Sequence, residues 1–139
     1  MEKVTVNWKG DMAFESNTPS GAHFVMDTYP EEGQVGLGPT PFEAFVTSAA
    51  ACSAIDVMLV LNKRRQKVES YRIEVEYERT EPGVYPRPIT KMIIKHIVKG
   101  ENIDEAAVAQ AVKLSDEKYC SVVATLRAAP QVESVWSIE

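Results

Sequence analysis

The sequence predicts a mixed α/β (α+β) fold: an antiparallel β-meander, a long buried central helix, and then further strands and helices. Three observations carry this prediction. Apolar and polar residues alternate over residues 4–9, as in a hairpin strand, and again over residues 71–78, as in a strand that buries one face. Between these stretches, residues 41–66 contain no internal Gly or Pro after a proline at the first position. With 139 residues, 45% of them hydrophobic, we expect one domain over residues 1–139.

The opening meander is predicted from turns that separate short alternating runs. Lys9-Gly10-Asp11 makes a tight turn into residues 12–15, and residues 17–21 make a second turn into a third strand at residues 22–27. Residues 28–38 contain three glycines and no periodicity, so we expect a mobile loop there.

The central helix has a well-defined start. Thr40 is placed as the N-cap, Pro41 as the first helical residue and Glu43 as the partner in a capping box. Residues 44–61 are almost entirely apolar, which predicts burial on all sides. About 26 helical residues span about 39 Å. This exceeds what a domain of this size needs, so we expect one end to pack against a second subunit.

The second half predicts a hairpin, two helical segments and a last strand. The strand at residues 71–78 is followed by the Pro-rich segment 81–88 and a partner strand over residues 89–98. A capped helix is expected to begin near Asp104, and a further helical piece runs through residues 121–126 and stops at Pro130. Residues 132–138 are expected to return as a strand.

Charge and hydropathy narrow the possible partners. The formal net charge is −5 and the basic residues are spread out, apart from a short cluster at residues 63–67, so we expect no nucleic-acid binding. The N-terminus lacks the apolar segment of a signal peptide, and no stretch approaches the roughly 18 apolar residues of a membrane span. We therefore expect a cytoplasmic protein without membrane contact, whose partners are small molecules or another subunit.

The two cysteines are the candidate reactive groups. Cys52 lies among Ala and Ser residues on the predicted helix, where a packed thiol is the ordinary outcome. Cys120 lies near a helix start, where backbone N–H groups can lower a thiol pKa. As a pair they suit peroxide chemistry, in which one thiolate attacks the peroxide and the second thiol captures the sulfenic acid. The sequence leaves open whether the two thiols meet.

No metal site is predicted from local spacing. The cysteines and the two histidines, His23 and His96, lack the short ligand spacings of zinc motifs. His96 falls on the apolar face of its strand, so we expect a packed, hydrogen-bonded histidine.

The segments GPTPFEAFVTSAAACSAIDVM and LSDEKYCSV resemble the OsmC/Ohr family of peroxide-related thiol proteins, and the similarity covers nearly the whole chain. The resemblance implies an intertwined homodimer with thiol sites near the subunit interface. It also implies that Cys52 is the peroxidatic and Cys120 the resolving cysteine of a stress-related peroxidase. Such an enzyme reduces organic hydroperoxides to alcohols and forms a disulfide between its two cysteines. An external dithiol then reduces this disulfide, and no bound cofactor is needed.

The sequence also departs from the family pattern. The family's peroxidases use a glutamate ten positions before the first cysteine, where this chain has Phe42, and an N-terminal arginine, which is missing before residue 64. Glu43 lies on the opposite side of the helix from Cys52 and is better explained as a cap. Asp56, one turn after Cys52, opposes thiolate formation unless a cation offsets it. Arg87, in the Pro-rich loop, is a supporting candidate for that cation.

These departures keep two alternatives open. One is a redox-responsive or small-molecule-binding stress protein of the same family without efficient peroxidase activity. The other is a structural dimer in which both cysteines only pack.

Overall fold

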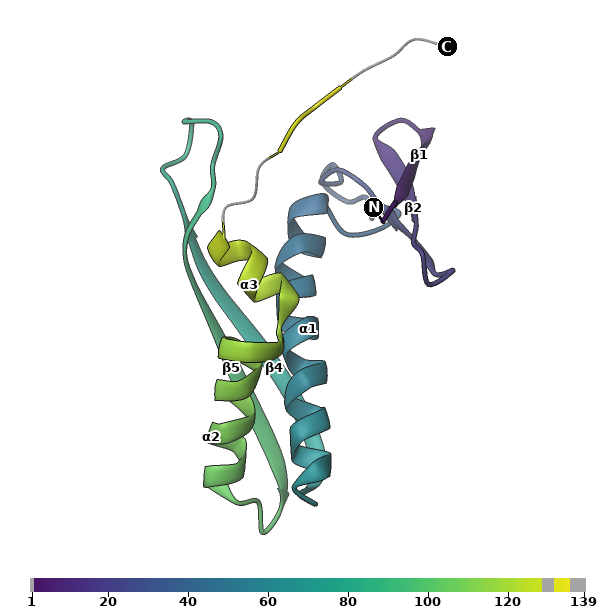
Figure 1. Cartoon of the computed structure of the whole chain (residues 1–139). Helices are drawn as coiled ribbons and strands as arrows, with labels where there is room; N and C mark the ends of the chain where they lie inside the picture. The colour runs from purple at the N-terminus through teal and green to yellow at the C-terminus, as the bar shows by residue number, and fades with distance from the viewer. Residues whose placement is uncertain (1, 129–131, 136–139) are drawn as a thin grey trace. The chain divides into compact units, whose positions relative to one another are not determined.

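The computed structural model describes residues 2–128 and 132–135 (Figure 1). The described residues form three α-helices, one π-helical turn and two antiparallel sheets, which confirms the predicted mixed fold. The chain divides into two compact units, residues 1–48 and 49–139. The expectation of one domain over residues 1–139 stays a prediction.

The first unit contains the predicted meander. Strands β1 (Thr5–Gly10), β2 (Ala13–Asn17) and β3 (His23–Met26) pair antiparallel in that order. The β1–β2 turn takes positive φ angles at Gly10 (107°) and Asp11 (45°), a conformation that Gly and Asp tolerate. Residues 27–40 form no helix or strand, as expected.

Helix α1 (Pro41–Lys63) begins with the predicted capping box. The Glu43 N–H donates to Thr40 Oγ1 over 3.2 Å, and the Thr40 N–H donates to Glu43 Oε2 over 2.8 Å. The helix ends three residues before the predicted end at Gln66. Arg65 adopts a left-handed conformation with φ 55°, and the Gln66 N–H closes the end by donating to the carbonyl of Leu61 over 3.0 Å.

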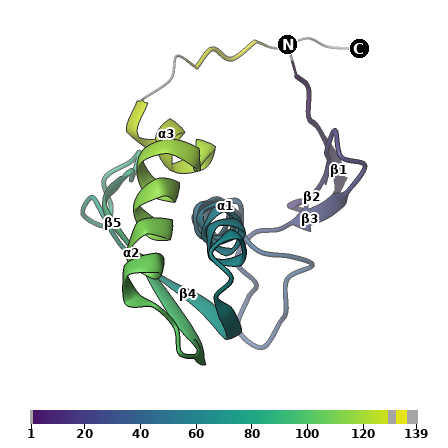
Figure 2. The same ribbon diagram turned by 60° about the horizontal axis from the view of Figure 1, so that its bottom comes forward.

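The second unit packs helices against a long hairpin. Strands β4 (Lys67–Arg79) and β5 (Ile89–Glu101) pair antiparallel, and helix α2 (Glu105–Leu114) lies beside α1 against this hairpin (Figures 1 and 2). The π-helical turn η1 (Ser115–Tyr119) and helix α3 (Ser121–Ala128) follow. The core joins α1 to α2 through four side chains that are fully buried: Val57, Leu61, Ala107 and Ala111.

Local contacts explain the element ends in this unit. The Asp104 carboxylate caps α2 by accepting the Ala106 N–H over 3.0 Å, which confirms the predicted helix start. Near the end of β5 the backbone passes so close to β4 that a Cβ at Gly100 would lie 2.0 Å from the Lys67 carbonyl oxygen. Of the predicted last strand, residues 132–135 have no regular structure, and residues 136–138 lie outside the described residues.

Within the single chain α1 is covered on one side only, and one expectation about this helix was wrong. The hairpin and α2 cover only one face of the helix, so Ile55 (62% exposed) and Leu59 (55%) remain accessible while Val57 and Leu61 are buried. In addition, α1 has the length and apolar composition of a membrane-spanning helix, although no such stretch was expected. Core helices of soluble proteins meet the same criterion.

Candidate functional site

The second unit brings the two cysteines together with an aspartate. Cys52 Sγ, Cys120 Sγ and a carboxylate oxygen of Asp56 all lie within 4.8 Å of one another. Cys52 and Asp56 are one turn apart on α1, and Cys120 directly precedes α3. Both thiols are free. The two sulfurs, whose separation the sequence could not predict, therefore lie close together. A modest movement would bring them to the disulfide bond length of about 2.05 Å.

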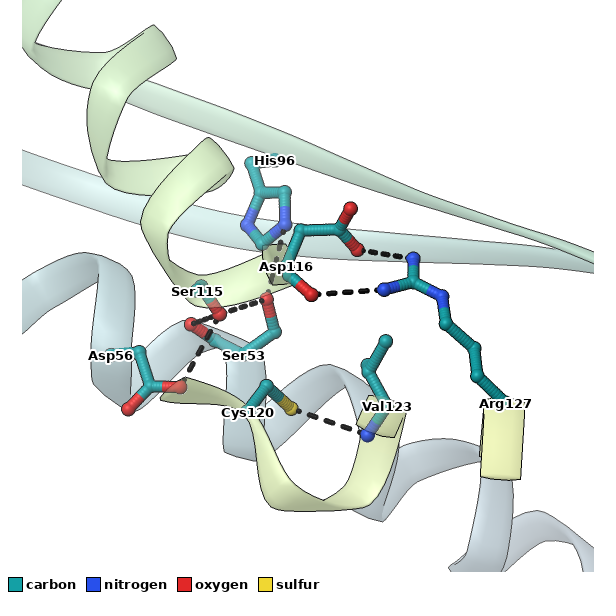
Figure 3. A network of polar contacts seen from close by, with 8 residues as sticks. All are labelled: Ser53, Asp56, His96, Ser115, Asp116, Cys120, Val123 and Arg127. Carbon is teal, nitrogen blue, oxygen red and sulfur yellow. Dashed lines mark hydrogen bonds and ion pairs between the residues drawn. The ribbon is translucent and has the colours of Figure 1, made fainter. Parts of the chain in front are cut away.

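The chain positions Cys120 by interrupting a helix. After η1 the Cys120 N–H donates to the Ser115 carbonyl over 2.9 Å, and Cys120 itself takes an extended conformation. The Cys120 carbonyl then accepts the first backbone bond of α3, from Ala124. Its sulfur accepts the Val123 N–H over 3.5 Å, as drawn in Figure 3. Cys120 thus caps α3 with its side chain.

The environment of Cys120 raises the pKa of its thiol. Burial, with only 3% of the residue exposed, is the largest cause. The Val123 and Val122 N–H groups lower the pKa, while a hydrogen bond to Cys52 and the charge of that neighbour raise it. The expectation that the helix start would lower this pKa was wrong, because desolvation outweighs the backbone donors.

A chain of polar contacts runs from Asp56 into the β4–β5 hairpin (Figure 3). Ser115 Oγ donates to Asp56 Oδ2 over 3.3 Å and lies 3.0 Å from Ser53 Oγ. Ser53 Oγ lies 3.4 Å from His96 Nε2, and His96 Nδ1 lies 2.6 Å from Tyr71 Oη. Ser115 and Ser53 are buried. The Asp56 carboxylate is therefore held in place by hydrogen bonds that run through Ser115 and Ser53 to His96.

One set of proton positions satisfies this whole network. Tyr71 donates to His96 Nδ1, and His96 Nε2–H donates to Ser53. The Ser53 hydroxyl then donates to Ser115, and the Ser115 hydroxyl donates to Asp56. This arrangement requires a neutral His96. Burial lowers the pKa of His96, with the charge of Asp116 a smaller opposing effect, and burial raises the pKa of Tyr71 to about 12. His96 is the packed, hydrogen-bonded histidine that the sequence predicted.

An ion pair fixes the segment that carries Cys120. Arg127 Nη2 lies 2.7 Å from Asp116 Oδ1, and Arg127 Nη1 donates to the Asp116 carbonyl over 2.9 Å. This double contact ties α3 to η1 on either side of the cysteine. Sequence inspection missed it, because the partners are eleven positions apart and no helical spacing links them.

The two other supporting candidates lie elsewhere. The Glu43 carboxylate is occupied by the capping box in the first unit. Arg87 donates from Nε to the Thr80 carbonyl over 3.0 Å, in the β4–β5 connection. Among the described residues, no lysine or arginine forms an ion pair with Asp56. The described contacts therefore do not join Arg87 to the thiols.

A cavity of about 680 Å³ adjoins this cluster between β5, α2 and α3. Ser53, His96 and Val123 line it, and the first two belong to the polar network while the third contacts Cys120. Much of the remaining lining is apolar and includes Met92, Ile94, Val112 and Leu126, with Lys91 and Lys113 among the charged residues. Neither sulfur lines the cavity.

Comparison with known proteins places the chain in a family. The protein-family model described as OsmC-like protein matches residues 32–135, which is most of the chain. The chain belongs to the OsmC-like family. It is 37% identical to Protein YhfA of Escherichia coli (strain K12) over 137 residues, which cover 98% of this chain and 97% of that protein. The OsmC-like resemblance seen in the sequence is confirmed.

Solved structures agree with this fold. A crystal structure of a hypothetical protein from Aquifex aeolicus VF5 matches with 31% identity and a TM-score of 0.74, over 91% of this chain and 87% of that one. An organic hydroperoxide resistance protein OsmC from Legionella pneumophila matches with a TM-score of 0.61 over 92% of this chain and 90% of that one. The latter is only 17% identical, so it shows the fold alone.

Proposed function

We propose that this OsmC-like protein is a thiol-dependent peroxidase that reduces organic hydroperoxides through Cys52 and Cys120. The observation that carries the proposal is the short distance between the two sulfurs, which lie within 4.8 Å although 67 residues separate them along the chain. A pair of this kind can pass from thiols to a disulfide without unfolding the site.

The reaction divides into two steps. The Cys52 thiolate attacks the terminal oxygen of the hydroperoxide, the O–O bond breaks, and the alkoxide takes a proton and leaves as the alcohol. Cys52 is then a sulfenic acid. The Cys120 sulfur attacks the Cys52 sulfur, a disulfide forms, and the hydroxyl group leaves as water with the thiol proton. An external dithiol returns both cysteines to the reduced state by thiol–disulfide exchange.

The environments of the two thiols support this assignment of roles. Cys52 is partly exposed, whereas only 3% of Cys120 is exposed and its thiol pKa is raised. An attacking thiolate must be reached by a bulky substrate, whereas a resolving thiol needs only to reach its partner. The Legionella protein that shares this fold is named for organic hydroperoxide resistance, and we propose the same substrate class for this chain.

We also propose that the protein acts as a cytoplasmic homodimer. The outward face of α1 carries Ile55 and Leu59, which are more than half exposed in the single chain. Contiguous exposed apolar surface of this kind marks an interaction site in a soluble protein. A change of Ile55 to Glu should shift the mass measured by light scattering from two chains toward one, whereas Glu105→Gln on α2 should leave it unchanged. A single-chain mass for the unaltered protein would contradict the dimer.

The direct test of the peroxidase is to mix the reduced protein with cumene hydroperoxide and to measure thiols and disulfides by mass spectrometry. One equivalent of hydroperoxide should convert both thiols into a Cys52–Cys120 disulfide and yield one equivalent of alcohol. Cys52→Ser should consume no hydroperoxide above the rate in buffer, while Ser48→Ala, an exposed change on the same helix, should behave like the unaltered protein. Consumption that survives Cys52→Ser would rule the mechanism out.

The cavity favours a second candidate function, a redox-responsive or small-molecule-binding protein without efficient peroxidase activity. Its volume suits a small ligand, and its mixed apolar and charged lining suits an amphipathic one. Phe42 in place of the family glutamate favours the same alternative. Native mass spectrometry of the purified protein would decide between them: a retained metabolite together with very slow oxidation by hydroperoxide would support binding over catalysis.

A further inference from the structure

The cluster that holds the two thiols also has the composition of a metal site. Two cysteine sulfurs and one carboxylate oxygen lie within 4.8 Å of one another, although no zinc-type spacing links these residues in the sequence. We propose that the reduced protein binds one thiophilic divalent cation, such as Zn²⁺, through Cys52, Cys120 and Asp56. The fourth coordination position is left to water or a small ligand.

The distances suit such an ion. Zinc–sulfur bonds of about 2.3 Å in a tetrahedral arrangement place two sulfurs about 3.8 Å apart. Two sulfurs at most 4.8 Å apart need to approach each other by at most about 1 Å to reach this separation. Cys52 and Asp56 lie one turn apart on the same helix, and Cys120 supplies the third donor from the residue just before α3.

The charges around the cluster also favour a cation. Ionised thiols and the carboxylate place up to three negative charges together, and within the described part of the chain no lysine or arginine pairs with Asp56. A divalent ion would offset that repulsion, because metal ligands bind as thiolates. The Val123 N–H already donates to the Cys120 sulfur.

The network behind Asp56 would orient this ligand. Ser115 donates to Asp56 Oδ2 over 3.3 Å and is itself hydrogen-bonded to Ser53, so the carboxylate is held in a defined orientation. Hydrogen bonds of this kind to ligating carboxylates are a regular feature of metal sites. Cys52 and Asp56 are partly exposed, so an ion can enter from solvent.

The site cannot bind a metal ion while Cys52 and Cys120 form a disulfide. When a two-electron oxidant takes one electron from each thiolate, the sulfurs join, both sulfur ligands are withdrawn, and the ion leaves as a free divalent cation. The site would therefore release its metal on oxidation. This coupling needs only disulfide formation by any oxidant, so it holds whether or not the protein is an efficient peroxidase.

The test is a titration of the reduced protein under anaerobic conditions with Zn²⁺ against a chromogenic chelator, and with Co²⁺ as a spectroscopic probe. We expect one ion per chain and a sulfur-to-cobalt charge-transfer absorption. Cys52→Ser and Cys120→Ser should each weaken that absorption and lower the affinity, and Asp56→Asn should lower the affinity about tenfold or more. Glu117→Gln, which changes an acid three positions before Cys120 and outside the cluster, should bind like the unaltered protein.

Oxidation with an azodicarboxamide, which makes disulfides without peroxide, should release the bound Zn²⁺ in step with disulfide formation. A cobalt spectrum without thiolate absorption, or zinc binding unchanged in Cys52→Ser and Asp56→Asn, would overturn the site. Circular dichroism shows which variants are folded. If Cys120→Ser does not fold, Cys52→Ser and Asp56→Asn still test whether the site binds the metal. A protein that consumes hydroperoxide but binds no metal would refute only this inference, and one that binds metal but consumes none would refute only the peroxidase.

Discussion

The two cysteines of the site have the same side chain in contrasting surroundings. Cys52 lies in the middle of a continuous helix and is partly exposed. Cys120 lies where one helix ends and another begins, with 3% of its surface exposed and a raised thiol pKa. Two sulfurs that lie within 4.8 Å of each other therefore differ in exposure, and burial raises the thiol pKa of Cys120. This contrast is the basis for proposing that Cys52 reacts with an outside molecule and Cys120 with its neighbour.

The largest effect on this comparison should come from removing the buried thiol. Cys120→Ser should still consume the first equivalent of hydroperoxide, because the attacking thiolate remains. Sustained turnover with a dithiol should fall about tenfold or more, since the sulfenic acid of Cys52 is left open to further oxidation. Stopped-flow peroxide assays and mass spectrometry for sulfinic acid measure both parts. Unchanged sustained turnover would show that Cys120 does not resolve the intermediate.

The difference in exposure predicts a difference in alkylation rate. In the reduced native protein, iodoacetamide should modify Cys52 about tenfold faster than Cys120, because alkylation requires an accessible thiolate and burial raises the pKa of Cys120. Peptide mass spectrometry at timed intervals gives the two rates, and the urea-unfolded protein provides the control with nearly equal rates. Equal rates in the native protein would remove the basis for separate roles.

The network behind Asp56 predicts a moderate loss of stability. Ser115→Ala removes a fully buried hydroxyl that contacts Asp56 and Ser53, so it should lower the free energy of unfolding by about 1–2 kcal/mol. Ser48→Ala, which removes an exposed hydroxyl on α1, should change it by less than about 0.5 kcal/mol. Urea denaturation measures both. Equal values for the two variants would mean that the network does not hold Asp56 in place.

The smallest predicted effect concerns pH and His96. Burial lowers its pKa in the folded state below the unfolded value of about 6.5, so the unfolded chain binds the proton more readily. The stability that depends on the neutral imidazole is therefore complete above about pH 6.5 and is lost as the pH falls through the folded pKa. His96→Gln should flatten this part of the stability profile between pH 7.5 and 5.5. A profile with the same slope in the variant would show that His96 is not the titrating group.

Much of the fold follows from local patterns in the sequence. The capping box at Thr40–Glu43 and the Asp104 cap depend on neighbours a few residues apart, and the structure contains both. The alternation correctly predicted two strands, β1 and β4. In β4 half-buried and exposed residues alternate over residues 71–76, whereas in β1 Val6 and Trp8 are more than half exposed. The exposed face of α1 was not predicted, because its composition is apolar on every side and only tertiary packing decides which face is covered.

The site was predictable only as a list of residues. Cys52 and Cys120 could be named, but their contact depends on how η1 and α3 place the second sulfur against α1. The serines that connect Asp56 to His96 carry no sequence signal of their own, because buried serines are also common as small packing residues. The raised pKa of Cys120 likewise depends on burial that only the folded chain provides.

The central claim is that Cys52 meets the hydroperoxide and Cys120 does not, and trapping the first intermediate tests it most directly. Cys120→Ser should be treated with one equivalent of cumene hydroperoxide in the presence of dimedone, which captures sulfenic acids, and the adduct should be located by peptide mass spectrometry. We expect one adduct per chain, on Cys52, and none in Cys52→Ser. A Cys52→Ser protein that acquires the adduct on Cys120 at a comparable rate would contradict it.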